Sequence, residues 1–141
     1  MKHRIAGAVL ALSVSFATDA LAADQLGKVD FPNSCSPAVQ EQLQRGVALL
    51  HSFYYSATQK AFEEVAAADH SCAIAAWGYA SILMGNPLQG VGALPKDVSR
   101  GQAAVEKGRA MGAKTQRERD YLEAVAAYYQ DFAQHSEHPA T

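Results

Sequence analysis

The chain has 141 residues, 49% hydrophobic and 18% charged, a composition that fits one folded domain and excludes a disordered segment or a large multidomain enzyme. Twelve Lys and Arg stand against fourteen Asp and Glu, so the formal net charge is −2 and no basic field is present to attract DNA or RNA. The two cysteines, Cys35 and Cys72, form no C-x-x-C pair and are too few for a four-cysteine zinc site.

The first 22 residues have the pattern of a secretory signal peptide. Lys2 and Arg4 form a basic end, an apolar segment covers residues 5–17, and an A-x-A cleavage sequence stands at 20–22. The apolar segment is shorter than the roughly 20 residues of a membrane-spanning helix, which favours cleavage over the alternative of a retained anchor. We therefore expect a periplasmic or secreted protein with no membrane span after cleavage, and an extended N-terminal segment at 23–35.

The remaining sequence predicts helices and no sheet, since no segment alternates apolar and polar residues in the manner of a strand. A serine–proline pair at 36–37 combines an N-cap residue with proline at the first helical position, and marks the start of the first helix. A second helix is expected to end near residues 69–71. The third begins near Cys72 and ends at the Gly-Asn-Pro sequence at 85–87.

Two further helices follow an ordered loop at residues 85–96 that is rich in glycine and proline. Asp97 is expected to cap the fourth helix, and Gly112 to end it. Thr115 and Glu118 form a capping box, in which each side chain satisfies a backbone N–H at the start of the fifth helix. That helix precedes a polar tail at 134–141 and carries an apolar stripe of Leu122, Val125, Tyr129 and Phe132, flanked by Tyr121 and Tyr128.

A pattern with the spacing i, i+3, i+4, i+7 occurs three times along the chain. Its copies are Gln42-Arg45-Gly46-Leu49, Trp77-Ala80-Ser81-Met84 and Tyr121-Ala124-Val125-Tyr128. In this pattern the sequence resembles the tetratricopeptide repeat (TPR) family, and more narrowly its bacterial secreted or periplasmic members of unassigned function. Phe62 stands where that family has an aromatic residue on the second helix. The chain departs from the family at Gln42, which replaces an aromatic residue, and at His70, which replaces the closing proline.

The resemblance implies an all-α, TPR-like α-solenoid of about two and a half helix-turn-helix repeats over residues 36–133. It also implies a non-enzymatic interaction module without a cofactor, which binds a protein or peptide partner in a groove lined by the first helix of each pair. The groove positions carried over from the family are Gln40, Leu43, Val47, His51, Ala75, Gly78, Ile82, Asn86, Arg119, Leu122, Ala126 and Tyr129. These are mainly apolar or small, which suits a helix or an apolar peptide better than a charged tail.

The cysteines are expected to pair. Because the first helices of stacked repeats run parallel, the resemblance implies that the helix starts at Cys35 and Cys72 lie side by side and form a disulfide; two separate buried thiols are the alternative. A second hypothesis of function, from a different class, is a thiol- or metal-handling protein that uses Cys35, Cys72 and His70.

No catalytic constellation is apparent in the sequence. The G-x-S-x-G, P-loop, G-x-G-x-x-G and H-E-x-x-H motifs are absent, so hydrolase, nucleotide-binding and zinc-peptidase functions have no support. His135 and His138 lie in the polar tail, where nothing holds metal ligands rigidly, and no metal site is expected there. His51 is expected to be a surface or partly packed residue.

The fifth helix raises the question of a further interaction. No capping helix follows it, so its apolar stripe is expected to remain open and to support self-association or contact with further repeats of a longer protein. The alternative is that the glycine-rich loop folds back and covers the stripe.

Overall fold

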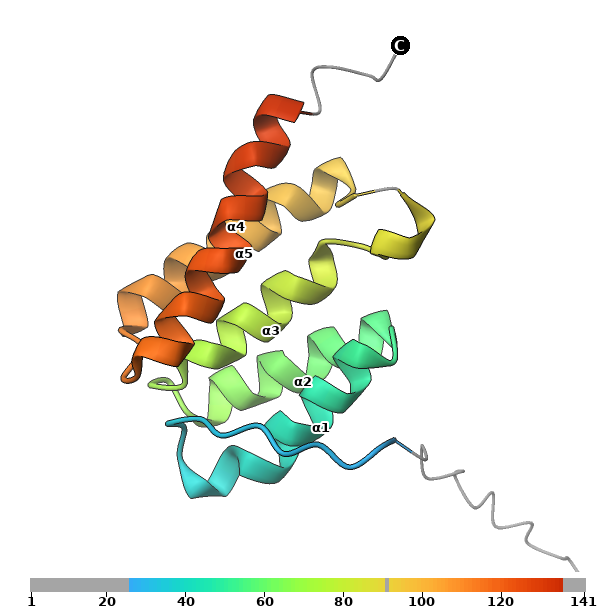
Figure 1. Ribbon diagram of the computed structural model, residues 1–141. Coiled ribbons are helices and arrows are strands. Elements are labelled where there is room, and N and C mark those ends of the chain that lie inside the picture. Colours follow the sequence, from blue (N-terminus) through green and yellow to red (C-terminus); the bar gives the residue numbers. More distant parts are fainter. Residues whose placement is uncertain (1–25, 91, 136–141) are drawn as a thin grey trace, which may run out of the picture.

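The computed structural model describes residues 26–90 and 92–135, which form five helices (Figure 1). They are α1 (Gln40–His51), α2 (Tyr55–Ala68), α3 (Ala73–Leu83), α4 (Pro95–Met111) and α5 (Gln116–His135), with short 3-10 turns at Pro37–Val39 and Pro87–Gln89. No strand occurs in these two ranges, so the predicted all-α class is confirmed. None of the helices found there is both long and apolar enough to cross a membrane. The predicted signal peptide at 1–22 lies outside the described residues, as does the end of the predicted tail, at 136–141.

Two of the predicted helix starts are confirmed by side-chain hydrogen bonds. The Ser36 hydroxyl accepts from the backbone N–H of Ala38 at 3.3 Å, ahead of a 3-10 turn that leads into α1. At α5, the hydroxyl of Thr115 accepts from the N–H of Glu118 and the Glu118 carboxylate accepts from the N–H of Thr115, each at 3.2 Å. These are the reciprocal bonds of a capping box.

The start of α4 differs from the prediction. The helix begins at Pro95, with Leu94 as its N-cap residue, two residues before the predicted cap Asp97. Proline has a fixed φ that suits the first helical position, so the helix starts there without a side-chain cap. Asp97 lies instead in the first turn, where its carboxylate is 2.8 Å from the guanidinium of Arg100.

The helices form two layers around a central helix (Figure 1). Each helix packs against the next one in the chain, and α3 also contacts both α1 and α5. One layer therefore holds α1, α3 and α5, and the other holds α2 and α4. Most of α3 is buried because neighbours surround it. The ring of Phe62 on α2 packs against Gly46 of α1 and Gly78 of α3, and the absence of a Cβ at both glycines lets the three helices approach closely.

The apolar stripe of α5 is covered, so the expectation of an open stripe is wrong. Leu122, Val125 and Tyr129 are buried against the core. The glycine-rich loop also folds onto this helix: the N–H of Ala93 donates to the Tyr128 hydroxyl at 2.9 Å, and that hydroxyl is 3.2 Å from the Met84 carbonyl oxygen. The loop thus covers the end of the stripe near Phe132, as in the alternative, while α3 and α4 bury Leu122 and Tyr129. The open surface that suggested self-association through α5 is therefore not present.

Candidate functional site

The chain covers the face of α1, α3 and α5 with its own N-terminal segment. We call residues 26–36 the strap; it is extended and crosses this layer toward the start of α5 (Figure 1). Its Phe31 is buried, stacks on Trp77 with a centroid distance of 5.3 Å, and meets Tyr121 edge-on at 5.6 Å. The guanidinium of Arg117 lies 4.7 Å from the centre of the Phe31 ring. One aromatic side chain of the strap thus fills a cage built from α3 and α5.

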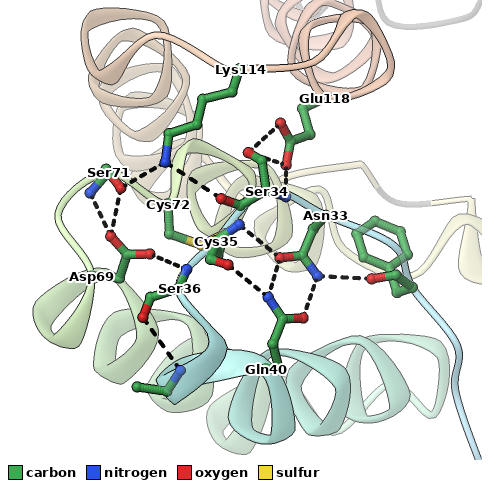
Figure 2. Close-up of a disulfide and its surroundings, with 12 residues drawn as sticks. Asn33, Ser34, Cys35, Ser36, Gln40, Asp69, Ser71, Cys72, Lys114 and Glu118 are labelled. Carbon is green, nitrogen blue, oxygen red and sulfur yellow. Dashed lines mark hydrogen bonds between the residues drawn. A yellow bond between two sulfur atoms is a disulfide. The ribbon is translucent and has the colours of Figure 1, made fainter.

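Hydrogen bonds fix the strap on both sides of this cage (Figure 2). The backbone N–H and the hydroxyl of Ser34 both donate to the Glu118 carboxylate, each at 2.7 Å. The side-chain amides of Asn33 and Gln40 exchange two hydrogen bonds of 2.8 Å. Burial disfavours the charged form of Glu118, but the hydrogen bonds from Ser34 and Thr115 outweigh it and hold its pKa below the usual value. Glu118 therefore caps α5 and anchors the strap with one carboxylate.

The predicted disulfide between Cys35 and Cys72 is confirmed, with a Cα–Cα distance of 4.7 Å. It joins the end of the strap to the N-cap residue of α3. The carboxylate of Asp69 lies beside it and accepts from the N–H of Ser36 at 2.7 Å and from the hydroxyl of Ser71 at 2.8 Å. These hydrogen bonds lower the pKa of Asp69.

This cluster bears on the thiol- or metal-handling hypothesis. The potential ligand atoms of Cys35, Asp69 and Cys72 lie within 4.8 Å of one another, but the two sulfur atoms are bonded to each other and Asp69 is engaged in hydrogen bonds. His70 does not join them, because its imidazole Nδ1 lies 3.1 Å from the Ala66 carbonyl oxygen on α2. The three residues of that hypothesis are therefore not assembled into one site.

Most of the predicted groove positions belong to the core. Eight of the twelve are buried, namely Leu43, Val47, Ala75, Gly78, Ile82, Leu122, Ala126 and Tyr129. They face neighbouring helices because α3 lies between four others, which leaves no open groove at these positions. The remaining four are at least partly exposed. Of these, Gln40 binds the strap and Arg119 donates to the Ala113 carbonyl oxygen. His51 is the last residue of α1, and Asn86 lies in the connection that follows α3.

An open groove lies instead on the opposite layer, between α2 and α4, with a volume of about 570 Å³. Its floor is α3, and six of its lining residues are alanines: Ala66, Ala67, Ala75, Ala76, Ala103 and Ala104. Glu63 and His70 line the α2 side, and Arg100 and Lys107 line the α4 side. We call this the α2/α4 groove.

Arg100 closes one end of the α2/α4 groove. Its guanidinium donates to the side-chain oxygen of Gln59 at 3.1 Å and to the Tyr79 hydroxyl, in addition to its ion pair with Asp97. This links the N-terminal halves of α2 and α4 across the face of α3. Lys107, two turns further along α4, is exposed and forms no hydrogen bond or ion pair within residues 26–90 and 92–135. The groove is therefore lined mainly by small apolar side chains, and the unpaired ammonium group of Lys107 lies on its α4 side.

Sequence reasoning missed both the strap and this groove. Phe31 is the sole aromatic residue of 23–35, and this could have suggested that it packs against the helices. Nothing in the sequence, however, indicated that Arg117 and Tyr121 would contact it. The groove residues were missed because the alanines of α2 and α4 carry no pattern that distinguishes a groove from packing.

Comparisons with known proteins add no further identification. No protein-family model, no curated protein and no solved structure was found to match this chain. The likeness to the TPR family stays a prediction from the sequence pattern, and the described residues form helices that each pack against the next one in the chain.

Proposed function

We propose that the chain is an exported, TPR-like, non-enzymatic interaction module that binds an apolar helix or peptide of a protein partner. The binding site in this proposal is the α2/α4 groove, because the strap occupies the opposite layer. The signal-peptide pattern and the disulfide, which suits an oxidising compartment, support export to the periplasm or exterior.

The observation that carries the proposal is the alanine lining of an open groove of about 570 Å³. Alanine side chains allow another backbone to approach closely, and a helix can lay its apolar face into such a groove. The groove extends along α2 from Phe62, past the end of this helix to His70, and along α4 from Arg100 to Met111. At a rise of about 1.5 Å per residue, this is the length of two to three helical turns of a partner.

Site-specific photocrosslinking tests the proposal in the producing cells. A photoreactive residue at Ala103, which is exposed in the groove, is compared with one at Ala127, which is exposed on α5 outside it. We expect one discrete adduct from Ala103 and none from Ala127. Ala67→Trp, which fills the groove, should reduce that adduct about tenfold, whereas Ala127→Trp should leave it unchanged. Equal adducts at both positions, or an adduct insensitive to Ala67→Trp, would contradict the proposal.

A further inference from the structure

The exposed large hydrophobic side chains of the described residues gather in two connections between helices. Phe53, Tyr54 and Tyr55 lie at the turn from α1 to α2 and are 40%, 51% and 37% exposed. Leu88 and Leu94 lie in the loop from α3 to α4 and are 84% and 54% exposed. Figure 1 shows this turn and this loop at the same end of the molecule, the end opposite the turn from α4 to α5. We call these five residues the aromatic end.

The backbone presents these side chains to solvent. Phe53 has φ of +57°, a conformation that is uncommon outside glycine and asparagine, and it follows directly on the end of α1. None of the five residues lines the α2/α4 groove or the smaller hollow between α4 and α5. They project from the connections, so they form protruding points and not the walls of a pocket.

The two connections that form this end carry no acidic residue. Between Glu41 and Glu63, and again between Asp69 and Asp97, the sequence contains no acidic residue, although acidic residues outnumber basic ones in the chain. Asp97 itself is paired with Arg100. Lys96 follows the loop directly, is exposed, and forms no hydrogen bond or ion pair within the described ranges. Protruding aromatic and aliphatic side chains thus stand beside an exposed lysine, on two connections that themselves contain no carboxylate.

We propose that the aromatic end binds the surface of an anionic phospholipid membrane. Tyrosine and phenylalanine bury their rings at the level of lipid headgroups, leucine reaches the acyl chains, and lysine contacts anionic headgroups. Side chains that protrude from the surface can insert among lipid headgroups, and none of these five residues lines a hollow that could receive a side chain of a partner. This contact is peripheral, and it is independent of the function proposed for the α2/α4 groove.

Vesicle flotation tests the proposal with protein purified from the exported fraction, whose N-terminus is identified by mass spectrometry. Vesicles of phosphatidylcholine alone are compared with vesicles that also contain phosphatidylglycerol. We expect binding to the anionic vesicles, weaker binding to the neutral ones, and a decrease at high salt because lipid charge is screened. A chain that binds neither vesicle, or binds both equally, overturns the proposal; the first result would favour a protein partner for this end.

Variants locate the contact. Tyr54→Ser combined with Leu94→Ser should reduce binding to anionic vesicles at least about tenfold, because two side chains no longer insert. Lys96→Glu should reduce it about fivefold. The control Lys114→Glu makes the same charge change at an exposed residue of the opposite end and should leave binding unchanged. Loss of binding in the control, or unchanged binding in the double variant, overturns the proposal. Far-UV circular dichroism melts verify that each variant is folded.

Discussion

A single added methyl group at Gly78 should destabilise the fold. A Cβ atom built there would lie 2.2 Å from Cζ of Phe62, far inside normal contact. The Phe62 ring is 1% exposed and cannot turn toward solvent, so the neighbouring helices must move. Overpacking a core costs about 1–3 kcal/mol, and this contact belongs at the upper end. Alanine recovers about 1 kcal/mol of helix propensity over glycine. We therefore expect Gly78→Ala to lower the free energy of unfolding by about 2 kcal/mol.

Gly46 supplies a matched control on the same ring. A Cβ there would lie 3.2 Å from the nearest Phe62 atoms, so the ring has to shift by only a few tenths of an ångström. The gain in helix propensity then nearly offsets the contact, and Gly46→Ala should change the stability by less than about 1 kcal/mol. Urea unfolding followed by far-UV circular dichroism measures both variants. Equal stability of Gly78→Ala and Gly46→Ala would refute the reasoning.

A double variant separates the ring contact from other effects of the methyl group. Phe62→Leu removes the outer atoms of the ring, so Gly78→Ala should cost at least about 1 kcal/mol less in that background than in the wild type. If the stability changes of Phe62→Leu and Gly78→Ala are additive, the added methyl group does not clash with the Phe62 ring.

The remaining predictions concern the strap and the loop. Replacing Cys35 and Cys72 together by serine should lower the free energy of unfolding by about 4 kcal/mol in the chain-entropy model, and a loss below about 1 kcal/mol in urea melts would contradict it. The lowered pKa of Glu118 stabilises the fold above its unfolded pKa, near 4.3, and this contribution disappears as the pH falls through the folded value. Glu118→Gln should therefore lower the free energy of unfolding by about 2 kcal/mol at pH 7. It should also make this free energy fall less steeply with decreasing pH than in the wild type, and an equally steep fall in both proteins would contradict the prediction. Tyr128→Phe removes the hydroxyl that binds the loop, and should speed limited proteolysis within residues 85–94 relative to Tyr55→Phe, whose hydroxyl lies outside this loop.

Local signals predicted the helices well, because their information lies within a few residues. Ser36 and the Thr115–Glu118 box marked helix starts through hydrogen bonds between near neighbours. Gly85, with φ of +83°, ended α3 where the sequence indicated. The error at Asp97 arose where two local signals competed, and the proline two residues earlier prevailed.

Long-range placement was harder to predict. The disulfide followed from the parallel helices of the resemblance, but the position of the strap depends on Arg117 and Tyr121, which lie more than eighty residues away in the chain. Eight of the predicted groove positions are buried, three of them on α3. This helix has apolar residues on all sides, and periodicity cannot tell which side of such a helix is open. Tyr129 illustrates this, since it is 1% exposed and its hydroxyl donates to the Ala80 carbonyl oxygen at 2.6 Å.

The sulfur bridge also changes how the chain bears mechanical load. It encloses α1 and α2 in a covalent ring that is closed between positions 37 residues apart. Tension applied between the strap and α5 passes directly from Cys35 to Cys72, so the enclosed helix pair carries none of it. Stretching the unfolded chain would leave roughly 120 Å of its contour length unextended while the bridge is intact. A single proteolytic cut within the ring would likewise leave both fragments joined.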